Sequence, residues 1–156
     1  MLTMNCVVVD EREGTSLARD AEQERTACRA PRILLAEDDL EMRTILASAL
    51  RGDGYEVVQV GDGVHLLHRL LYSKLFFGNG SGFDLIISDV RMPELSGLGV
   101  LASLQGDDAA PPVILISAFG DRETHAEAEK LGAIALFDKP FDVEDFRVAV
   151  RAALAA

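Results

Sequence analysis

Apolar and polar residues form alternating blocks along this chain, and the blocks predict five strands that each precede a helix. The strands are short apolar runs, at residues 32–36, 55–60, 83–88, 113–117 and 133–137. After each run, apolar residues recur at the three- and four-residue spacing of a helix, at about residues 42–50, 64–75, 98–104, 121–131 and 143–154. Strands that alternate with helices in this way predict a parallel sheet with helices on both faces.

Residues with known turn and capping preferences mark the ends of several elements. Gly52 and Gly54 follow the first helical segment and are expected to end it. Asp39 and Asp142 stand just before helical segments, where an aspartate can cap free backbone N–H groups. Asp84 stands at the start of the third apolar run, and we expect it only to open that strand.

Two helical segments depart from the usual one-sided pattern. The segment 64–75 is apolar on more than one face, which predicts a substantially buried helix. The segment 121–131 has only alanines and Leu131 on its apolar face, so we expect it to pack weakly and to be adjustable in position. The Gly-rich stretch 76–82 predicts a flexible loop before the third strand.

Residues 1–30 lack the regular pattern. A short apolar run is followed by polar residues of mixed charge, whose only expected structure is a fraying helix over residues 16–28. We interpret this stretch as an N-terminal extension, mostly disordered or loosely docked. Val7–Val9 could instead add an edge strand, or the true start codon could lie downstream. Residues 31–156 are expected to form the single domain, with no effector domain after it.

Composition and charge narrow the function classes. A chain of 156 residues with 49% hydrophobic and 26% charged residues is typical of one globular domain with a tail. The formal charge of −11 argues against a nucleic-acid-binding surface. Cys6 and Cys28 are too few and too isolated for a disulfide framework or a zinc motif. No apolar run approaches the roughly 20 residues of a membrane span, and the N-terminus lacks a signal-peptide layout, so a cytoplasmic protein is predicted.

Polar residues that could bind ligands or react stand at the ends of four predicted strands. They are Glu37 and Asp38, Asp89, Ser117, and Asp138 with Lys139. In an open parallel sheet the carboxyl ends of the strands meet at one rim, which is where ligands bind. Three carboxylates at one rim repel one another unless a cation joins them. All-oxygen ligation suits Mg²⁺, and a carboxylate is a possible nucleophile for a phosphoryl group. A lysine would offset part of the charge.

Four stretches, "ILLAEDD", "DLIISDVRMPELSG", "PVILISA" and "FDKPF", resemble the marks of the two-component response-regulator receiver domain of the CheY-like superfamily. The resemblance covers residues 32–156. It implies a flavodoxin-like, doubly wound α/β fold whose five-stranded parallel sheet has the order 2-1-3-4-5.

The resemblance assigns Asp89 as the residue that a sensor histidine kinase or a histidine phosphotransfer protein phosphorylates. Glu37 and Asp38 correspond to the paired acids that bind Mg²⁺ together with Asp89 and the backbone carbonyl of Arg91. The side chain of Arg91 is expected to face the phosphoryl group and to influence its hydrolysis.

Ser117 occupies the family's Ser/Thr switch position, and Lys139 the position of the lysine that contacts the phosphoryl group. The Lys139–Pro140 peptide corresponds to one that is usually cis in the family. The position three before the lysine usually carries an aromatic ring that turns inward upon phosphorylation, but here it is Leu136, followed by Phe137. Either a version with leucine and serine operates, or the signal passes through the fourth helix and its loops.

The leading interpretation is a phosphoacceptor switch that catalyses only its own phosphoryl transfer and dephosphorylation, present as a monomer or weak dimer. Its downstream protein partner would bind the fourth helix, fifth strand and fifth helix. An interaction module that no longer depends on phosphorylation is the alternative. A flavin carrier or a haloacid-dehalogenase-type phosphatase fits less well, because acids follow the first strand and Arg91 replaces a second catalytic aspartate.

The three histidines have simpler explanations than catalysis. His65 and His68 share one helical segment, but no third metal ligand is near them in the sequence, so surface or groove positions are expected. His125 lies in the weakly packed segment, where a solvated side chain is expected.

Overall fold

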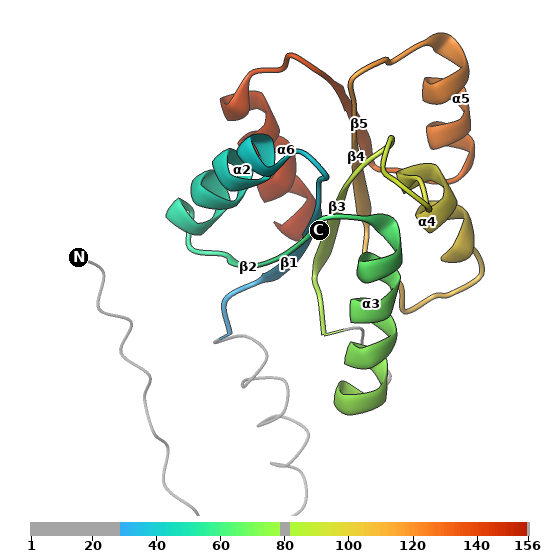
Figure 1. Cartoon of the computed structure of the whole chain (residues 1–156). Helices are drawn as coiled ribbons and strands as arrows, with labels where there is room; N and C mark the ends of the chain where they lie inside the picture. The colour runs from blue at the N-terminus through green and yellow to red at the C-terminus, as the bar shows by residue number, and fades with distance from the viewer. Residues whose placement is uncertain (1–28, 79–81, 156) are drawn as a thin grey trace, which may run out of the picture. The chain divides into compact units, whose positions relative to one another are not determined.

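Five parallel strands form one sheet at the centre of this computed structural model, which describes residues 29–78 and 82–155 (Figure 1). The strands are β1 (Arg32–Ala36), β2 (Glu56–Val60), β3 (Leu85–Asp89), β4 (Val113–Ser117) and β5 (Ala135–Asp138). Their order is β2-β1-β3-β4-β5, and every neighbouring pair is parallel. The predicted flavodoxin-like α/β fold is confirmed.

Five helices cover the two faces of the sheet. They are α2 (Leu40–Gly52), α3 (Gly63–Phe77), α4 (Gly97–Ser103), α5 (Arg122–Lys130) and α6 (Val143–Ala155). Helices α2 and α6 lie on one face, and α3, α4 and α5 lie on the other (Figure 1). The central strands β3 and β4 therefore have helices on both sides, which explains why they are buried along their whole length.

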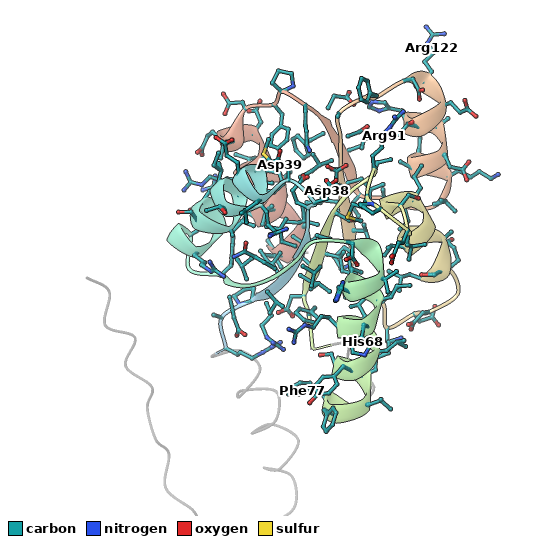
Figure 2. The ribbon with its side chains drawn as sticks, in the orientation of Figure 1. Asp38, Asp39, His68, Phe77, Arg91 and Arg122 are labelled. Atoms are coloured by element: carbon teal, nitrogen blue, oxygen red, sulfur yellow. The ribbon has the colours of Figure 1, made fainter. Side chains whose placement is uncertain are left out.

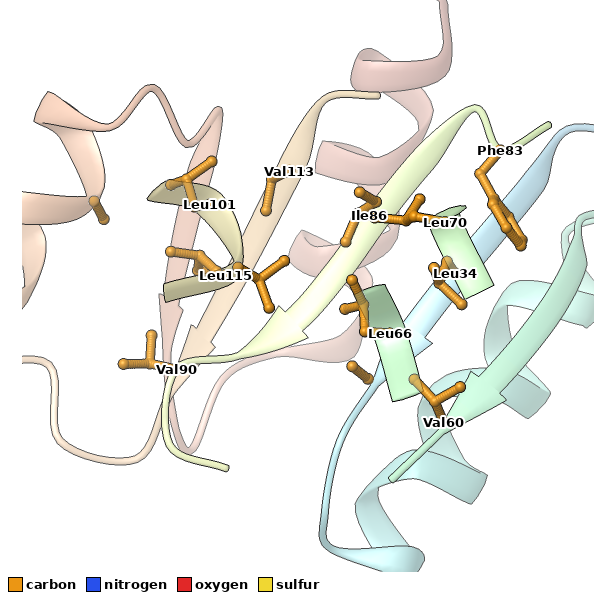
Figure 3. Packing of buried hydrophobic residues seen from close by; sticks show 13 residues of the cluster. Leu34, Val60, Leu66, Leu70, Phe83, Ile86, Val90, Leu101, Val113 and Leu115 are labelled. Carbon is orange, nitrogen blue, oxygen red and sulfur yellow. The ribbon is translucent and has the colours of Figure 1, made fainter. Parts of the chain in front are cut away.

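Alternate side chains of each strand supply two separate hydrophobic cores, because successive residues of a strand point to opposite faces. Leu34 and Ile86 pack with Leu66 and Leu70 of α3 in one core (Figure 3). Ile33, Leu35 and their neighbours pack with α2 and α6 in the other. Both cores end near the carboxyl ends of the strands, so the polar residues there are held by two packed layers.

The predicted helix starts are confirmed by side-chain hydrogen bonds. The N–H of Met42 donates to the Asp39 carboxylate at 2.8 Å, and the N–H of Glu144 donates to Asp142 at 2.7 Å. Asp84 does more than open β3, because its carboxylate accepts a 2.7 Å hydrogen bond from the backbone N–H of Arg32. It thereby fastens the start of β1 to the segment before β3.

The prediction for the second helical segment was wrong in two respects. Helix α3 runs on through Phe77, so Phe76 and Phe77 belong to the helix and not to the loop. Its only buried residues are Gly63, Leu66, Leu70 and Ser73, whereas Leu75 is 82% exposed. Only one side of α3 faces the sheet, and apolar spacing cannot tell whether a second apolar side has a neighbour.

Other boundaries differ by one or two residues. Strand β2 begins at Glu56, β3 runs from Leu85 to Asp89, and β5 runs from Ala135 to Asp138. Helix α4 begins at Gly97, where Ser96 accepts the N–H of Gly99 at 3.0 Å. As predicted, α5 packs weakly, since Ala128 is its one buried residue.

Pro31–Ala156 forms one compact unit. The predicted extension over residues 1–30, including its fraying helix, falls outside the described residues except for its last two positions. Within the described ranges, none of the helices combines the length and the hydropathy that a bilayer-spanning segment requires.

Candidate functional site

The polar residues predicted at the strand ends lie at one rim of the sheet. Glu37 and Asp38 follow β1, Asp89 is the last residue of β3, and Ser117 is the last residue of β4. Lys139 directly follows β5. Figure 2 shows Asp38 and Arg91 close together at this end of the molecule. Segments far apart in the sequence therefore meet here because the strands are parallel.

Three carboxylates form the centre of the site. Oxygen atoms of Glu37, Asp38 and Asp89 lie within 4.8 Å of one another. Glu37 and Asp89 are almost completely buried, with exposed fractions of 0% and 3%, whereas Asp38 is exposed. Buried carboxylates at this spacing are costly unless cations or hydrogen-bond donors compensate them.

Lys139 supplies that compensation for the two buried acids. Its Nζ donates to Asp89 Oδ2 at 2.7 Å and to Glu37 Oε2 at 2.9 Å. The backbone N–H of Lys139 donates to the carbonyl of Ser117 at 2.7 Å, which fixes the lysine to the end of β4. The Lys139–Pro140 peptide is cis, as the family resemblance implied.

The close contacts change the protonation of this cluster. Burial raises the pKa of Glu37 from 4.5 to about 7, although its hydrogen bond from Lys139 acts in the opposite direction and neighbouring Asp89 adds to the rise. Burial by itself lowers the pKa of Lys139, but its hydrogen bonds to Asp89 and Glu37 outweigh burial and raise that pKa. Lys139 thus stays cationic at neutral pH, where Glu37 is close to titration.

The Asp89 carboxylate is held in position by the loop that follows it. Its Oδ1 accepts a 2.9 Å hydrogen bond from the backbone N–H of Arg91. The N–H of Val90 donates to the Ile116 carbonyl at 2.7 Å, which ties the loop to β4. A side chain at Gly97 would place its Cβ only 2.3 Å from the Asp89 carbonyl oxygen. Glycine is needed there because α4 begins against the backbone of β3.

Ser117 and Arg91 lie beside the acids in different ways. Ser117 is fully buried, and its Oγ accepts the N–H of Phe119 at 3.2 Å. The Arg91 guanidinium lies over the Phe119 ring at 4.8 Å from its centroid. Phe119 is 64% exposed, and sequence reasoning missed its role. An aromatic residue just past the end of the fourth strand was the available signal.

A hydrogen bond between α5 and β5 was also missed. His125 Nε2 lies 2.9 Å from Oδ2 of Asp138, the residue that precedes Lys139 in the chain. His125 is exposed, as expected, but it connects the weakly packed helix to the rim. His65 pairs with Asp62 at 2.6 Å. His65 and His68 are both exposed, which confirms the surface positions expected for them.

Leu136 and the neighbouring ring face opposite sides of the sheet. Leu136 packs against the core under α3, α4 and α5. Phe137 packs on the other side, with ring centroids 5.5 Å from Phe141 and 5.7 Å from Phe146. Phe137 therefore cannot stand in for the aromatic residue that the family resemblance led us to expect at position 136.

The donor set fits a hard divalent cation. All three side chains offer oxygen, which Mg²⁺ prefers, and Mg²⁺ commonly uses only a few protein ligands and keeps several waters. Asp38 lines an open depression of about 560 Å³ together with Arg91, Met92 and Ser96. An ion could reach Asp38 through this depression.

Comparisons with known proteins agree with this geometry. The family model described as "Response regulator receiver domain" matches residues 33–151. The chain is 34% identical over 123 residues to the transcriptional regulatory protein ZraR of Escherichia coli, which covers 79% of this chain and 26% of that protein.

Two solved structures are similar in fold and sequence. One is the signal receiver domain of a signal transduction histidine kinase from Syntrophus aciditrophicus, with a TM-score of 0.69, 29% identity and coverage of 81% of this chain and 91% of that one. The other is the chemotaxis protein CheY4 of Vibrio cholerae, with a TM-score of 0.68, 25% identity and coverage of 81% and 100%. The chain spans about a quarter of the length of the first curated relatives that it matches.

Proposed function

The chain belongs to the response regulator receiver domain family, and we propose that it is a signalling switch that accepts a phosphoryl group on Asp89. One observation carries the proposal: the buried Asp89 carboxylate accepts hydrogen bonds from Lys139 and from the Arg91 backbone while it lies beside two further acids. Members of the family are not enzymes beyond their own phosphoryl transfer.

In the proposed reaction, an oxygen of the Asp89 carboxylate attacks the phosphorus of a phosphohistidine. A P–O bond forms, the P–N bond of the donor breaks, and the donor histidine leaves with the electron pair of that bond. Asp89 suits this role because its strand and the Gly97 contact hold it rigidly at the rim. Lys139 would contact an oxygen of the transferred group, as it now contacts the carboxylate.

We assign Mg²⁺ to Glu37, Asp38, Asp89 and the backbone carbonyl of Arg91. When bound, Mg²⁺ supplies charge neutralisation for the transferred oxygens. Glu37 and Asp89 are buried, so their side chains would be ligands held in place by the fold. Asp38 is exposed and would be the ligand accessible from solvent.

We further propose that the phosphorylated state is transmitted by Ser117 and α5. Ser117 would release the Phe119 N–H and turn its hydroxyl to the phosphoryl group, which moves the loop that leads into α5. Helix α5 can follow because it buries only Ala128. The position of Leu136 in the core supports this route over one that depends on an aromatic residue.

The partners follow from the same assignment. The donor would be a sensor histidine kinase or a histidine phosphotransfer protein, and a downstream protein would bind the face of α5, β5 and α6. The charge of −11 supports a protein target and not a nucleic acid. We place the exchange in the cytoplasm, with residues 31–156 as the receiver unit and residues 1–30 as an extension.

Phosphoryl transfer can be tested by intact-mass measurement after incubation with Mg²⁺ and either acetyl phosphate or phosphoramidate. We expect a single phosphoryl adduct on the wild-type chain, none on Asp89→Asn, and an unchanged adduct on Asp108→Asn, a matched control at an exposed aspartate. Absence of an adduct with both donors would instead favour an interaction module independent of phosphate. An adduct that persists in Asp89→Asn would show that the acceptor is misassigned.

A further inference from the structure

The Arg91 side chain reaches from the loop after β3 (residues 90–96, the acceptor loop) to the loop that leads into α5 (residues 118–121). Its backbone N–H donates to Asp89 Oδ1 at 2.9 Å, whereas its guanidinium lies 4.8 Å from the centroid of the Phe119 ring. In the described structure, the ion pairs of Asp89 and Glu37 are with Lys139. The charge of Arg91 therefore rests on an aromatic face, two positions from the proposed phosphoacceptor.

Phe119 connects this contact to the start of α5. Its backbone N–H donates to Ser117 Oγ at 3.2 Å, and its carbonyl accepts the N–H of Asp121 at 3.0 Å. Asp121 is the N-cap of α5, where its carboxylate accepts the N–H of Thr124 at 2.8 Å. One residue thus contacts Ser117, the side chain of Arg91 and the cap of α5.

The Arg91 charge also acts on the first turn of α5. Two hydrogen bonds from Thr124 are the main reason why the pKa of Asp121 is lowered, and the charge of Arg91 adds to that shift. A guanidinium over an aromatic face is attracted by the quadrupole of the ring, weakly at an exposed site. Phe119 is 64% exposed, so a nearby anion of high charge can draw the guanidinium away from it.

Loop 118–121 has a second anchor on β5. Gly120 lies so close to the Asp138 carboxylate that no side chain fits at this glycine. Asp138 Oδ2 also lies 2.9 Å from His125 Nε2 on α5. Loss of the Arg91 contact would therefore loosen the loop without detaching it from the sheet. Of the two anchors, Arg91 is the one that belongs to the acceptor loop.

We infer that Phe119 is a positioning residue, whose ring holds the Arg91 guanidinium against loop 118–121 until Asp89 is phosphorylated. The holding step needs no phosphoryl group, whereas the release rests on the proposed function. An acyl phosphate at Asp89 carries about two negative charges over three oxygens. A planar guanidinium binds such oxygens through charge-assisted hydrogen bonds, which are stronger than an exposed cation–π contact.

Release of the ring would give the molecule two changes at once. Loop 118–121 loses its contact with the acceptor loop, so α5 gains freedom to move. The Phe119 ring becomes available to a downstream protein, and aromatic side chains are frequent anchors of protein interfaces. Phe119 would thereby do at the end of β4 what Leu136 cannot do inside the core.

NMR of the full, unphosphorylated chain tests the holding step. In Phe119→Leu, which keeps the apolar bulk but removes the ring face, we expect the ring-current shift of the Arg91 Nε–H signal to disappear. Exchange protection of the Asp121 and Thr124 amides should fall about two- to fivefold, the range expected for an exposed cation–π contact. Phe119→Tyr should restore both signals. Adding Arg91→Gln to Phe119→Leu should cause no further loss, because the contact is already absent.

Phe77→Leu is the matched control. Phe77 is 65% exposed, and the Arg32 guanidinium lies over its ring at 5.8 Å from the centroid. Figure 2 shows Phe77 on α3, away from Arg91 at the rim. This variant removes an equally exposed ring with an arginine over it, and it should leave the Arg91 signal and the protection of α5 unchanged.

Phosphorylation of the same samples tests the release. Under excess phosphoramidate with Mg²⁺, intact mass reports the adduct while NMR reports the position of the Arg91 side chain. In the wild-type adduct we expect the ring-current shift of Arg91 to be lost. The protection of Asp121 and Thr124 should fall to the level of unphosphorylated Phe119→Leu.

Different results would overturn the two steps. Additive effects of Arg91→Gln and Phe119→Leu, or an equal loss of protection in Phe77→Leu, would contradict the holding step. An adduct that leaves the Arg91 signal unchanged would contradict the release while supporting phosphorylation of Asp89. Absence of an adduct would contradict both the proposed function and the release, whereas the unphosphorylated samples decide the holding step by themselves.

Discussion

At the scale of single residues, the site depends on pairing each buried charge. Asp89 and Glu37 can both lie almost fully buried because Lys139 donates to each of them. No buried side-chain nitrogen or oxygen in the described residues lacks a hydrogen-bond partner. Loss of a partner in such a cluster leaves an uncompensated buried charge, which costs far more than a surface ion pair contributes.

Gly97 is a position at which the neighbouring backbone leaves no room for a side chain. In Gly97→Ala the new Cβ would meet the Asp89 carbonyl oxygen at 2.3 Å, so the loop that holds Asp89 must shift. We expect phosphorylation by acetyl phosphate to slow at least tenfold and the free energy of unfolding to fall by about 1–3 kcal/mol. Intact-mass time courses and urea unfolding measure the two effects.

Gly52→Ala is the control for Gly97→Ala, because nothing lies within 4 Å of an added Cβ at Gly52, which is also helical. Its phosphorylation rate should equal that of the wild type. A wild-type rate in Gly97→Ala would show that the loop tolerates the displacement and that its contact with Asp89 does not govern reactivity.

At the scale of elements, α5 differs from the other helices in having fewer buried residues to anchor it to the sheet. Its one buried residue is Ala128, whereas α2 buries Leu46, Ala47 and Leu50. The His125–Asp138 hydrogen bond joins α5 to β5 beside the site. Few buried contacts imply a low free energy of local opening, so α5 is the element most able to respond to a change at the rim.

Hydrogen exchange should detect this difference between helices. We expect amides in the middle of α5 to exchange at least tenfold faster than those in the middle of α2, because less apolar surface must be exposed to open α5. In His125→Ala, exchange in α5 should be faster still, and exchange in α2 should not change. Equal protection of α5 and α2 in the wild type would contradict the assignment of α5 as the mobile element.

At the scale of the whole molecule, two hydrophobic cores meet at a charged rim. The sheet separates the cores, and the loops after β1, β3, β4 and β5 bring their polar residues together where both cores end. Folding therefore places Glu37 in a buried position beside Asp89. Ionising this buried carboxyl lowers the free energy of unfolding of the whole domain.

Global stability should consequently fall as pH rises through neutrality when no metal is present. The pKa of Glu37 is about 7 in the folded state against 4.5 ordinarily, so the folded state holds more protons between these values, and stability falls as the pH rises from about 4.5 to about 7. Urea unfolding in EDTA should give a free energy of unfolding lower at pH 8 than at pH 5, by on the order of 1–3 kcal/mol from this group.

Glu37→Gln isolates that contribution, because glutamine keeps the shape but does not titrate, while the histidines remain. The difference between pH 5 and pH 8 should shrink in this variant. If it matches that of the wild type, the pH dependence comes from other groups, and Glu37 is ionised in the folded protein throughout this range.

The sequence by itself determined the parts of this protein that depend on local pattern. Short apolar runs and helical spacing located all five strands and five helices, and Asp39 capped its helix as predicted. Site residues could be proposed because parallel strands must bring their carboxyl ends to one rim. The strand order came from the resemblance to the family and not from spacing, which contains no information about which strands are neighbours.

Only the tertiary structure decided which groups touch. Lys139 and Glu37 are 102 positions apart. The pKa of Glu37 is raised by burial and by Asp89, and it is held down by that contact with Lys139. The contacts of Arg91 with Phe119 and of His125 with Asp138 join separate loops and helices. The outer apolar side of α3 is exposed, although the sequence predicted a substantially buried helix, for the same reason. Periodicity reports which residues share a side of a helix, whereas burial depends on what other segments pack there.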